Sequence, residues 1–174
     1  MQIYNQTKSY LKNPQPVSDN LLYGEFHENS KHTTRMPYMK PVYDVLEKNR
    51  GKVIYFDFWA RWCPPCLAEM EPLKQLRSKF STDDLIIYSI CVSEPKEQWE
   101  ECLNEYSLKN RGIECVHVTD YLGIDNYQKI RKQWKIDRMP YYILINRQGQ
   151  IIDFGTAARP SNPQLVSRIE EAVK

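Results

Sequence analysis

The feature that most limits the fold of this chain is a pair of cysteines placed where a buried strand gives way to a helix. Residues Val53 to Trp59 form a nearly continuous apolar run, which is typical of a strand covered on both faces. Ala-Arg-Trp-Cys-Pro-Pro-Cys follows, with the cysteines at 63 and 66. Cys63 is therefore expected at a helix N-terminus, where free N–H groups and the helix dipole favour a thiolate. Cys66 lies one turn later and is expected to be more covered. Because the thiolate is the nucleophile of disulfide exchange, this arrangement predicts a redox pair in which Cys63 attacks and Cys66 resolves.

A zinc site is the alternative use of this cysteine pair. Structural zinc needs two more ligands, which usually come from a second close pair of cysteines or histidines. No such pair exists, because the remaining candidates stand apart in the sequence, at Cys91, Cys102, Cys115, His27, His32 and His117. The sequence therefore predicts a redox pair with neither a metal nor an organic cofactor, since the two sulfurs themselves carry the electrons.

The three other cysteines fit the interior of the fold. With five cysteines in the chain, at least one must remain free, which excludes a scaffold held together by many disulfides. Cys91 and Cys115 fall in apolar strand patterns, and Cys102 falls on an apolar helix face. All three are expected to pack as small hydrophobic side chains.

Length and composition indicate one globular domain. The chain has 174 residues, of which 41% are hydrophobic and 12% aromatic, and this is enough to build a core. The net charge is only +2 and no stretch gathers lysine and arginine, which argues against nucleic-acid binding. No run of about 18 apolar residues is present, so no transmembrane helix is predicted.

The start of the sequence does not resemble a secretory signal. Residues 1–20 carry asparagine, glutamine, lysine and aspartate where a signal peptide needs an apolar stretch. Two explanations remain open. We favour a chain from which a leader, a membrane anchor or an upstream domain has been removed, and the alternative is a cytoplasmic protein.

Apolar periodicity and cap residues predict alternating helices and strands after residue 38. The expected helices are 39–48, 65–80 with a kink at Pro72, one that begins at 93–95 and carries Tyr106, one around 127–134, and a last helix capped by Asn162 with Pro163 in its first turn. The expected strands are 53–59, 85–92 and 115–118, followed by a hairpin of 141–145 and 150–154. This alternation predicts an α/β domain with a mixed sheet between helices.

Several motifs around this pattern resemble the thioredoxin superfamily. Trp62 directly precedes the first cysteine, Asp57 lies six residues before it, and Arg-Met-Pro-Tyr-Tyr-Ile-Leu-Ile and Asn-Arg-Gln-Gly-Gln follow at 138–150. The long middle segment and the Ala-Arg-Pro-Ser-Asn-Pro ending at 158–163 are similar to the envelope thiol-disulfide oxidoreductases related to TlpA and ResA. The resemblance implies a thioredoxin-like mixed sheet flanked by helices.

The resemblance divides the chain into two parts. It covers residues 38–174, which are expected to form the thioredoxin-like domain. Residues 1–37 match nothing in it and are expected to form an irregular N-terminal extension that wraps the domain, since its scattered aromatic residues argue against a purely solvated tail. The alternative is a remnant of an upstream domain or linker.

A second marker of the family is Pro140. In the superfamily the equivalent proline follows a cis peptide bond and faces the dithiol, and the resemblance implies the same here. This arrangement leaves the backbone of Met139 free to pair with an extended segment of a substrate. Met139 is bulkier than the residue usual before this proline, so the groove is expected to differ from that of related proteins. The alternative is an ordinary trans proline at the start of a strand.

The residues beside Cys63 are expected to shape its reactivity. Pro64 and Pro65 suit the first turn of a helix and stiffen the ring that the disulfide closes. Trp62 is expected to be exposed and to contact the substrate together with these prolines. Arg61 is either a cation that lowers the pKa of the Cys63 thiol or a solvent-facing side chain.

Two acids are candidates for proton transfer. Asp57 falls within an apolar strand, where burial raises the pKa of a carboxyl group. In thioredoxins an acid at this place lies beneath the second cysteine and serves its proton transfers, whereas the alternative is an aspartate paired with a lysine. Glu69, three residues after Cys66, matches a glutamate near the dithiol of ResA-like reductases, and the alternative is a solvated surface residue. The family's helix proline usually follows five residues after the second cysteine, but Pro72 follows after six.

The resemblance implies thiol-disulfide exchange on other proteins, in the direction of reduction. It also implies two kinds of partner: a disulfide-containing protein substrate and a separate thiol donor that restores the dithiol. The expected place is the cell envelope or periplasm, with the cytoplasm as the alternative. A different class of function also remains open, namely a thioredoxin-like domain of a larger envelope protein that binds a partner without turnover.

Overall fold

A mixed six-stranded sheet forms the centre of the domain. The computed structural model describes residues 15–16, 37–93 and 95–174. In the described chain the strands are β1 (Gln15–Pro16), β2 (Val53–Trp59), β3 (Leu85–Cys91), β4 (Ile113–His117), β5 (Tyr141–Ile145) and β6 (Gln150–Gly155). Their order across the sheet is β1-β6-β5-β2-β3-β4, with β2, β3 and β4 parallel and β5 antiparallel to both of its neighbours. The predicted mixed sheet is therefore confirmed.

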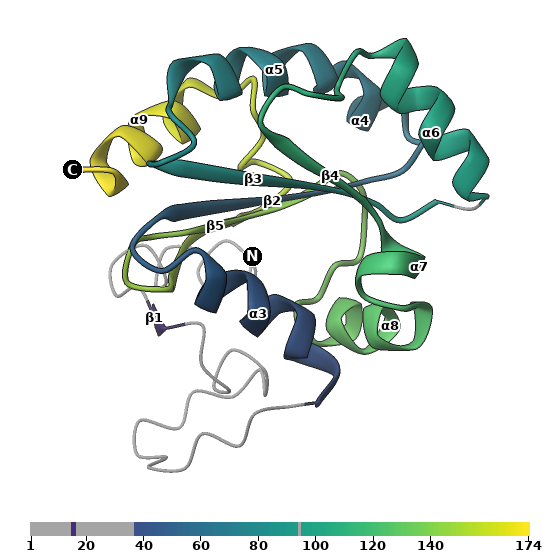
Figure 1. Cartoon of the computed structure of the whole chain (residues 1–174), viewed down its shortest axis with the longest axis horizontal. Helices are drawn as coiled ribbons and strands as arrows, with labels where there is room; N and C mark the ends of the chain where they lie inside the picture. Colours follow the sequence, from purple (N-terminus) through teal and green to yellow (C-terminus); the bar gives the residue numbers. More distant parts are fainter. Residues whose placement is uncertain (1–14, 17–36, 94) are drawn as a thin grey trace, which may run out of the picture.

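Helices cover both faces of this sheet (Figure 1). The described helical elements are η1 (Pro37–Met39), α3 (Lys40–Lys48), α4 (Pro64–Ala68), α5 (Met70–Lys79), α6 (Lys96–Glu105), α7 (Val118–Tyr121), α8 (Ile124–Gln133) and α9 (Pro163–Ala172). Figure 1 shows α3, α7 and α8 on one face and α4, α5, α6 and α9 on the other. The thioredoxin-like α/β fold predicted from the sequence is thus confirmed.

Strand β2 separates two cores by the alternation of its side chains. Phe56 and Phe58 point into the cluster beneath α3 and α8, whereas Val53 and Tyr55 point into the cluster beneath α5 and α9. All seven residues of β2 are buried, as expected for a strand covered on both faces. Because alternate side chains share a face, Asp57 projects to the side of the sheet that α4 and α5 cover.

The helix predicted over residues 65–80 is instead two helices, and the break comes earlier than expected. Helix α4 ends at Ala68 and α5 begins at Met70, so the break is at Glu69 rather than at Pro72. The physical reason lies in the proline itself. Pro72 has no N–H to donate and its ring clashes with the carbonyl four residues earlier, which is that of Ala68. The interruption therefore falls one turn ahead of the proline.

A second difference concerns the region after β3. The strand predicted at 115–118 runs instead over Ile113–His117, and Val118 begins the short helix α7, which the sequence pattern did not predict. The His117 side chain accepts a hydrogen bond from the N–H of Thr119 and so caps this helix. Four residues are too few to show an apolar period, which is why α7 could not be predicted from the sequence.

The last helix and its cap follow the sequence prediction. Asn162 accepts a hydrogen bond from the N–H of Gln164 at 3.0 Å, and Pro163 occupies the first turn of α9. Leu165 and Ile169 are fully buried against the sheet. The preceding loop is therefore held at a fixed place beside the end of β6.

Most of the predicted N-terminal extension, residues 1–37, lies outside the described residues. Where the chain is described, Gln15 and Pro16 pair with Ile151 and Gln150 and add an antiparallel edge strand next to β6. Across residues 15–16, 37–93 and 95–174, no helix is both long enough and apolar enough to cross a membrane.

Candidate active site

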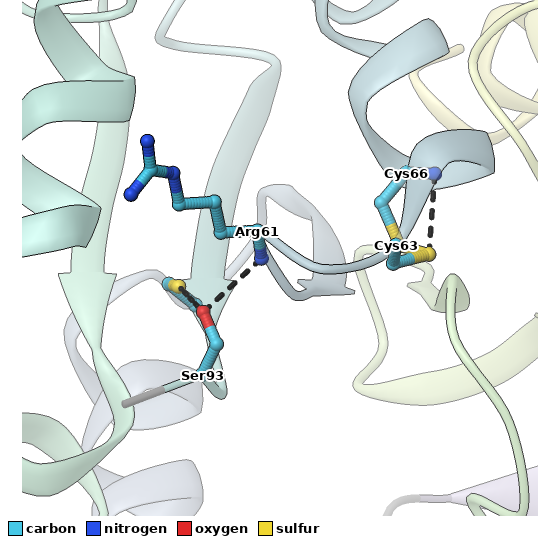
Figure 2. The surroundings of a disulfide bond; sticks show 5 residues. Arg61, Cys63, Cys66 and Ser93 are labelled. Atoms are coloured by element: carbon cyan, nitrogen blue, oxygen red, sulfur yellow. Dashed lines mark hydrogen bonds between the residues drawn. A yellow bond between two sulfur atoms is a disulfide. The ribbon is translucent and has the colours of Figure 1, made fainter. Parts of the chain in front are cut away.

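The two cysteines form a disulfide where β2 passes into α4. Cys63 is the N-cap of α4, and its Cα lies 5.3 Å from that of Cys66. The N–H of Cys66 donates to the sulfur of Cys63 at 3.3 Å, as the dashed line in Figure 2 shows. Pro64 and Pro65 occupy the first turn, where their missing N–H groups have no helical partner to lose. The local sequence thus places the Cys63 sulfur at the free N–H groups of a helix start.

Both sulfurs are largely shielded from solvent. Cys63 is 4% exposed and Cys66 is 2% exposed. Cys66 is therefore the more covered cysteine, as predicted, but the difference in exposure is small. They belong to an apolar cluster of buried side chains that the structure gathers at one end of the sheet: Trp59, Ala60, Cys63, Cys66, Met70, Cys91, Cys102, Leu103 and Leu108. In contrast, Trp62 is 69% exposed, as predicted. A large apolar surface therefore stands directly beside the shielded disulfide.

Arg61 does not lie over the disulfide. Its guanidinium group is 3.4 Å from the carboxylate of Glu101 on α6. Figure 2 shows the side chain pointing away from Cys63 and Cys66. This contact favours the second of the two alternatives for Arg61, a solvent-facing side chain, over a cation held beside the attacking sulfur. The residue instead forms a surface ion pair with α6.

Ser93 anchors the loop that carries the cysteines, and sequence reasoning missed this role. Its hydroxyl accepts a hydrogen bond from the N–H of Arg61 at 3.1 Å and lies 3.2 Å from the sulfur of Cys91. Its carbonyl accepts from Nε2 of His117 at 2.8 Å. These contacts connect the ends of β2, β3 and β4. The only signal in the sequence was a serine just after an apolar strand.

Asp57 is buried and is paired with a neutral partner. It is 4% exposed, and the hydroxyl of Ser89 donates to its Oδ2 at 3.0 Å. Burial raises the pKa of Asp57 to about 7, the Ser89 hydrogen bond opposes this rise, and the nearby charge of Glu69 adds to it. No lysine pairs with Asp57 in the described part of the chain, so the alternative of an ion pair finds no support there. The structure thus agrees with the prediction that Asp57 is buried and that burial raises its pKa.

Glu69 is not a solvated surface residue. It is 9% exposed and sits at the break between α4 and α5. Its carboxylate accepts two hydrogen bonds from Ser161, one from the N–H at 2.9 Å and one from the hydroxyl at 2.6 Å. The fold thus brings the loop before α9 onto the helix that carries Cys66.

The Met139–Pro140 peptide bond is cis, as the sequence resemblance implied. Pro140 is buried, and Met139 is half-buried and packs against the cluster that contains the two cysteines. The entry to β5 therefore lies at the same end of the sheet as the disulfide. The bulk of Met139 contributes an apolar wall there.

Tyr142 is a further polar group on this face that the sequence analysis did not single out. It lies opposite Asp57 in the register of β5 and β2 and stacks on Tyr55, with ring centroids 5.7 Å apart. Its buried hydroxyl has no hydrogen-bond partner among the described residues. Burial raises the pKa of Tyr142, and the charges of Asp57 and Glu69 raise it further. The signal available in sequence was a tyrosine two residues after Pro140.

The remaining cysteines are free thiols of low reactivity. Cys91 and Cys102 are buried, while Cys115 is half-buried and so less enclosed than predicted. Burial raises the pKa of each thiol, in the case of Cys115 to about 12. Within the described ranges no group of three His, Cys, Asp or Glu side chains is placed to hold a metal ion.

Comparison with known families and curated proteins supports a redox role for this arrangement. The family model described as Redoxin matches residues 40–173. The chain is 26% identical over 108 residues to the thiol-disulfide oxidoreductase ResA of Bacillus thuringiensis strain Al Hakam, covering 62% of this chain and 57% of that protein. It is 25% identical to ResA of Halalkalibacterium halodurans, covering 74% of this chain and 66% of that protein. The chain thus spans less than two thirds of the length of these relatives.

Solved structures show the same fold. A candidate thiol-disulfide oxidoreductase from Bacteroides vulgatus is 35% identical with a TM-score of 0.54, covering 72% of this chain and 76% of that one. The thioredoxin domain of another thiol-disulfide oxidoreductase from Bacteroides vulgatus is 22% identical with a TM-score of 0.62, covering 74% and 84%. The second likeness concerns the fold alone.

Proposed function

We propose that this chain, which belongs to the Redoxin family, is a thiol-disulfide oxidoreductase that reduces disulfides of other proteins through Cys63 and Cys66. The observation that carries the proposal is the Cys63–Cys66 disulfide itself, placed at the start of α4 with the Cys63 sulfur accepting a backbone N–H. An N–H aimed at that sulfur favours its thiolate over its thiol.

The reaction proceeds in two exchanges. In the reduced protein the Cys63 thiolate attacks one sulfur of a substrate disulfide, which forms a mixed disulfide and releases the other substrate sulfur as a thiolate. The Cys66 thiolate then attacks Cys63, which closes the 63–66 disulfide and releases the second substrate sulfur. The substrate gains two electrons and the protein loses two. A separate thiol donor must return them before the next cycle.

Asp57 is the proposed proton acceptor for Cys66. Its side chain projects to the face of the sheet on which α4 and its second cysteine lie. A pKa of about 7 suits an acid that must both accept and release a proton near neutrality. Glu69, fixed by Ser161 at the end of α4, is the second acid of this face. We propose that Glu69 acts through its charge on Asp57 and does not itself react with a sulfur.

Trp62, Pro64, Pro65, Met139 and Pro140 form the proposed binding surface for the substrate. The exposed Trp62 supplies apolar contact beside the attacking sulfur. The backbone of Met139, just before a cis proline, is suited to pair with an extended substrate segment. A groove of this kind recognises main chain and apolar side chains more than a particular sequence.

We further propose that the protein works in the cell envelope or periplasm, with the cytoplasm as the alternative. The support is the resemblance of residues 158–163 to the envelope thiol-disulfide oxidoreductases, and a secreted disulfide oxidoreductase of Mycobacterium tuberculosis shares the fold. Reduction is the proposed direction by analogy with ResA. An upstream domain or membrane anchor outside the given sequence is compatible with the share of the relatives that this chain spans.

Catalytic reduction of insulin by the purified protein with a dithiol donor tests the proposal. Cys63→Ser should reduce the rate to that of the donor alone, because the attacking sulfur is gone. Cys115→Ala is the matched control, since it removes a free thiol whose pKa burial raises to about 12, and it should keep the parent rate.

Two results would contradict the proposal. Full activity of the Cys63→Ser variant would assign the chemistry to another group. An inactive parent with an intact 63–66 disulfide that still binds a partner protein would favour the rival function, a thioredoxin-like domain that binds without turnover.

A further inference from the structure

Ser161 holds a buried carboxylate from a distant part of the chain. It lies 92 residues after Glu69, in the loop between β6 and α9. Its N–H donates to Oε2 of Glu69 at 2.9 Å and its hydroxyl donates to Oε1 at 2.6 Å. Because each carboxylate oxygen has its own donor, the plane and the position of the carboxylate are both fixed.

Hydrogen bonds rather than a cation hold Glu69 in place. The two donors of Ser161 hold both oxygens of this carboxylate, and a charge-assisted hydrogen bond is about twice as strong as a neutral one. No lysine or arginine forms an ion pair with Glu69 among residues 37–93 and 95–174. The negative charge therefore stays uncompensated and can act on its neighbours across a poorly solvated space.

Asp57 is the acid on which this charge acts. Electrostatic interactions connect Asp57 with Tyr55, Cys91, Cys115, Tyr142 and Glu69, and the Ser89 hydroxyl donates a hydrogen bond to it. Glu69 is the one carboxylate of this set, and its charge raises the pKa of Asp57. The Arg159 cation acts on Tyr142 rather than on Asp57.

We propose that Ser161 is a positioning residue of the redox reaction, because it fixes the Glu69 carboxylate whose charge acts on Asp57, and so governs when Asp57 can take the proton of Cys66. The inference rests on the proposed function and adds to it a residue outside the cysteine motif. Glu69 lies at a helix break, where its side chain has no capping bond to its own helix. Without the Ser161 hydroxyl, only the N–H of Ser161 still holds the carboxylate, so the carboxylate turns more readily toward solvent and its repulsion of ionised Asp57 weakens.

The direct test follows the titration of Asp57 by carbon-13 NMR in the oxidised protein, with the signal assigned from an Asp57→Asn sample. In Ser161→Ala the midpoint should fall by about 0.5 pH unit, and in Glu69→Gln by about 1 unit, since removal of a nearby like charge lowers the pKa of an acid. Ser161→Thr keeps a hydroxyl and should restore the parent midpoint. Ser167→Ala, at an exposed serine of α9, is the matched control and should show no shift.

The pH–rate profile of insulin reduction gives the second readout. Its acidic limb should move in the same direction and by the same amount as the Asp57 midpoint in each variant. An Asp57 midpoint that is unchanged in Ser161→Ala and Glu69→Gln would overturn the proposal. A lower melting temperature without a shift would do the same, because it would make Ser161 a structural tie between the loop and α4.

The titration needs no substrate, so the two proposals fail separately. A shifted midpoint in a parent protein that does not reduce insulin would support the Ser161 contact and overturn the proposed function. An unchanged midpoint in an active parent would overturn the role of Ser161 and leave the proposed function standing.

Discussion

The two faces of the central sheet differ in what they enclose. On the side of α3 and α8, β2 presents Phe56 and Phe58 to an aromatic core in which Phe58 lies 6.3 Å from Trp134 and 6.4 Å from Tyr127, centroid to centroid. On the side of α4 and α5, the same strand presents Asp57 between Tyr55 and Trp59. One face is almost wholly apolar, while the other contains a buried acid, a second acid and the Tyr142 hydroxyl, which has no hydrogen-bond partner among the described residues.

Neighbouring side chains of β2 therefore have different roles: those on the aromatic face stabilise the fold, and Asp57 on the other face takes part in the proposed reaction. Burial of apolar area stabilises the fold, whereas burial of an acid destabilises it unless the acid is neutral or well paired. We therefore expect substitutions on the aromatic face to change stability more than rate, and substitutions on the cysteine face to change rate more than stability. The following predictions test that division, from the largest expected effect to the smallest.

Cys66→Ser should give the largest effect, a loss of turnover to the level of the donor alone. The resolving sulfur is absent, so the mixed disulfide between Cys63 and the substrate persists. Non-reducing gels should show adducts that disappear on reduction, while the melting temperature of the reduced protein stays near that of the reduced parent. Adducts that also form in a Cys63→Ser background would show that Cys91, Cys102 or Cys115 is the attacking thiol.

Phe58→Ala should lower the free energy of unfolding by about 3–5 kcal/mol, the usual cost of removing a buried phenyl ring. Below its melting temperature this variant should retain most of the parent's rate of insulin reduction. Urea unfolding and the insulin assay measure the two effects on one sample. Phe58→Leu, which leaves a smaller cavity, keeps the test usable if the alanine variant does not fold. A large loss of rate in folded Phe58→Leu would contradict the division of the two faces.

Asp57→Asn should slow turnover at pH 7 by at least about 10-fold, within the range for loss of a general base. Near pH 9 the loss should be much smaller, because the Cys66 thiol then ionises without help. A pH–rate profile of parent and variant makes the comparison. Ser78→Ala, at an exposed serine of α5, serves as the control for surface effects. An equal loss of rate at every pH would mark Asp57 as a structural residue.

The same substitution should raise stability, by an amount that depends on pH. The pKa of Asp57 is about 7 in the folded protein and near 4 in the unfolded chain, so folding favours the protonated acid. Its cost is absent below about pH 4, grows as pH rises to about 7 and is constant above that. Above pH 7 the free energy of unfolding of Asp57→Asn should therefore exceed that of the parent, by on the order of 4 kcal/mol. Thermal melts between pH 4 and 8 measure the difference, and a destabilised variant at pH 8 would contradict it.

Arg61→Gln should have the smallest effect. Its ion pair with Glu101 is exposed, and such pairs contribute about 0–1 kcal/mol. Since the guanidinium points away from Cys63, the rate of insulin reduction should stay within about 2-fold of the parent, and Glu101→Gln should match it. If the pH–rate profile shifts to higher pH in Arg61→Gln but not in Glu101→Gln, Arg61 is instead a cation that activates the attacking thiol.

Several elements of the fold were predictable from local sequence. The apolar run of β2, the cysteines at the head of a helix and the Asn162–Pro163 cap each fall within a few adjacent residues, and each structure matches its pattern. The place of Asp57 within the apolar run was also enough to predict its burial and the raised pKa. The cis bond before Pro140 depended on family resemblance, because local sequence left the trans form equally open.

The sequence by itself therefore determined the redox pair, its helix start and the buried acid beside it, since neighbours along the chain create these features. Only the tertiary structure decided that Ser161 fixes Glu69, that Ser93 anchors the cysteine loop and that Arg61 turns toward α6. These contacts join residues 32 to 92 positions apart. Apolar periodicity reports which face of an element is buried, but the partner of a polar side chain depends on which loops the packed sheet and helices bring together.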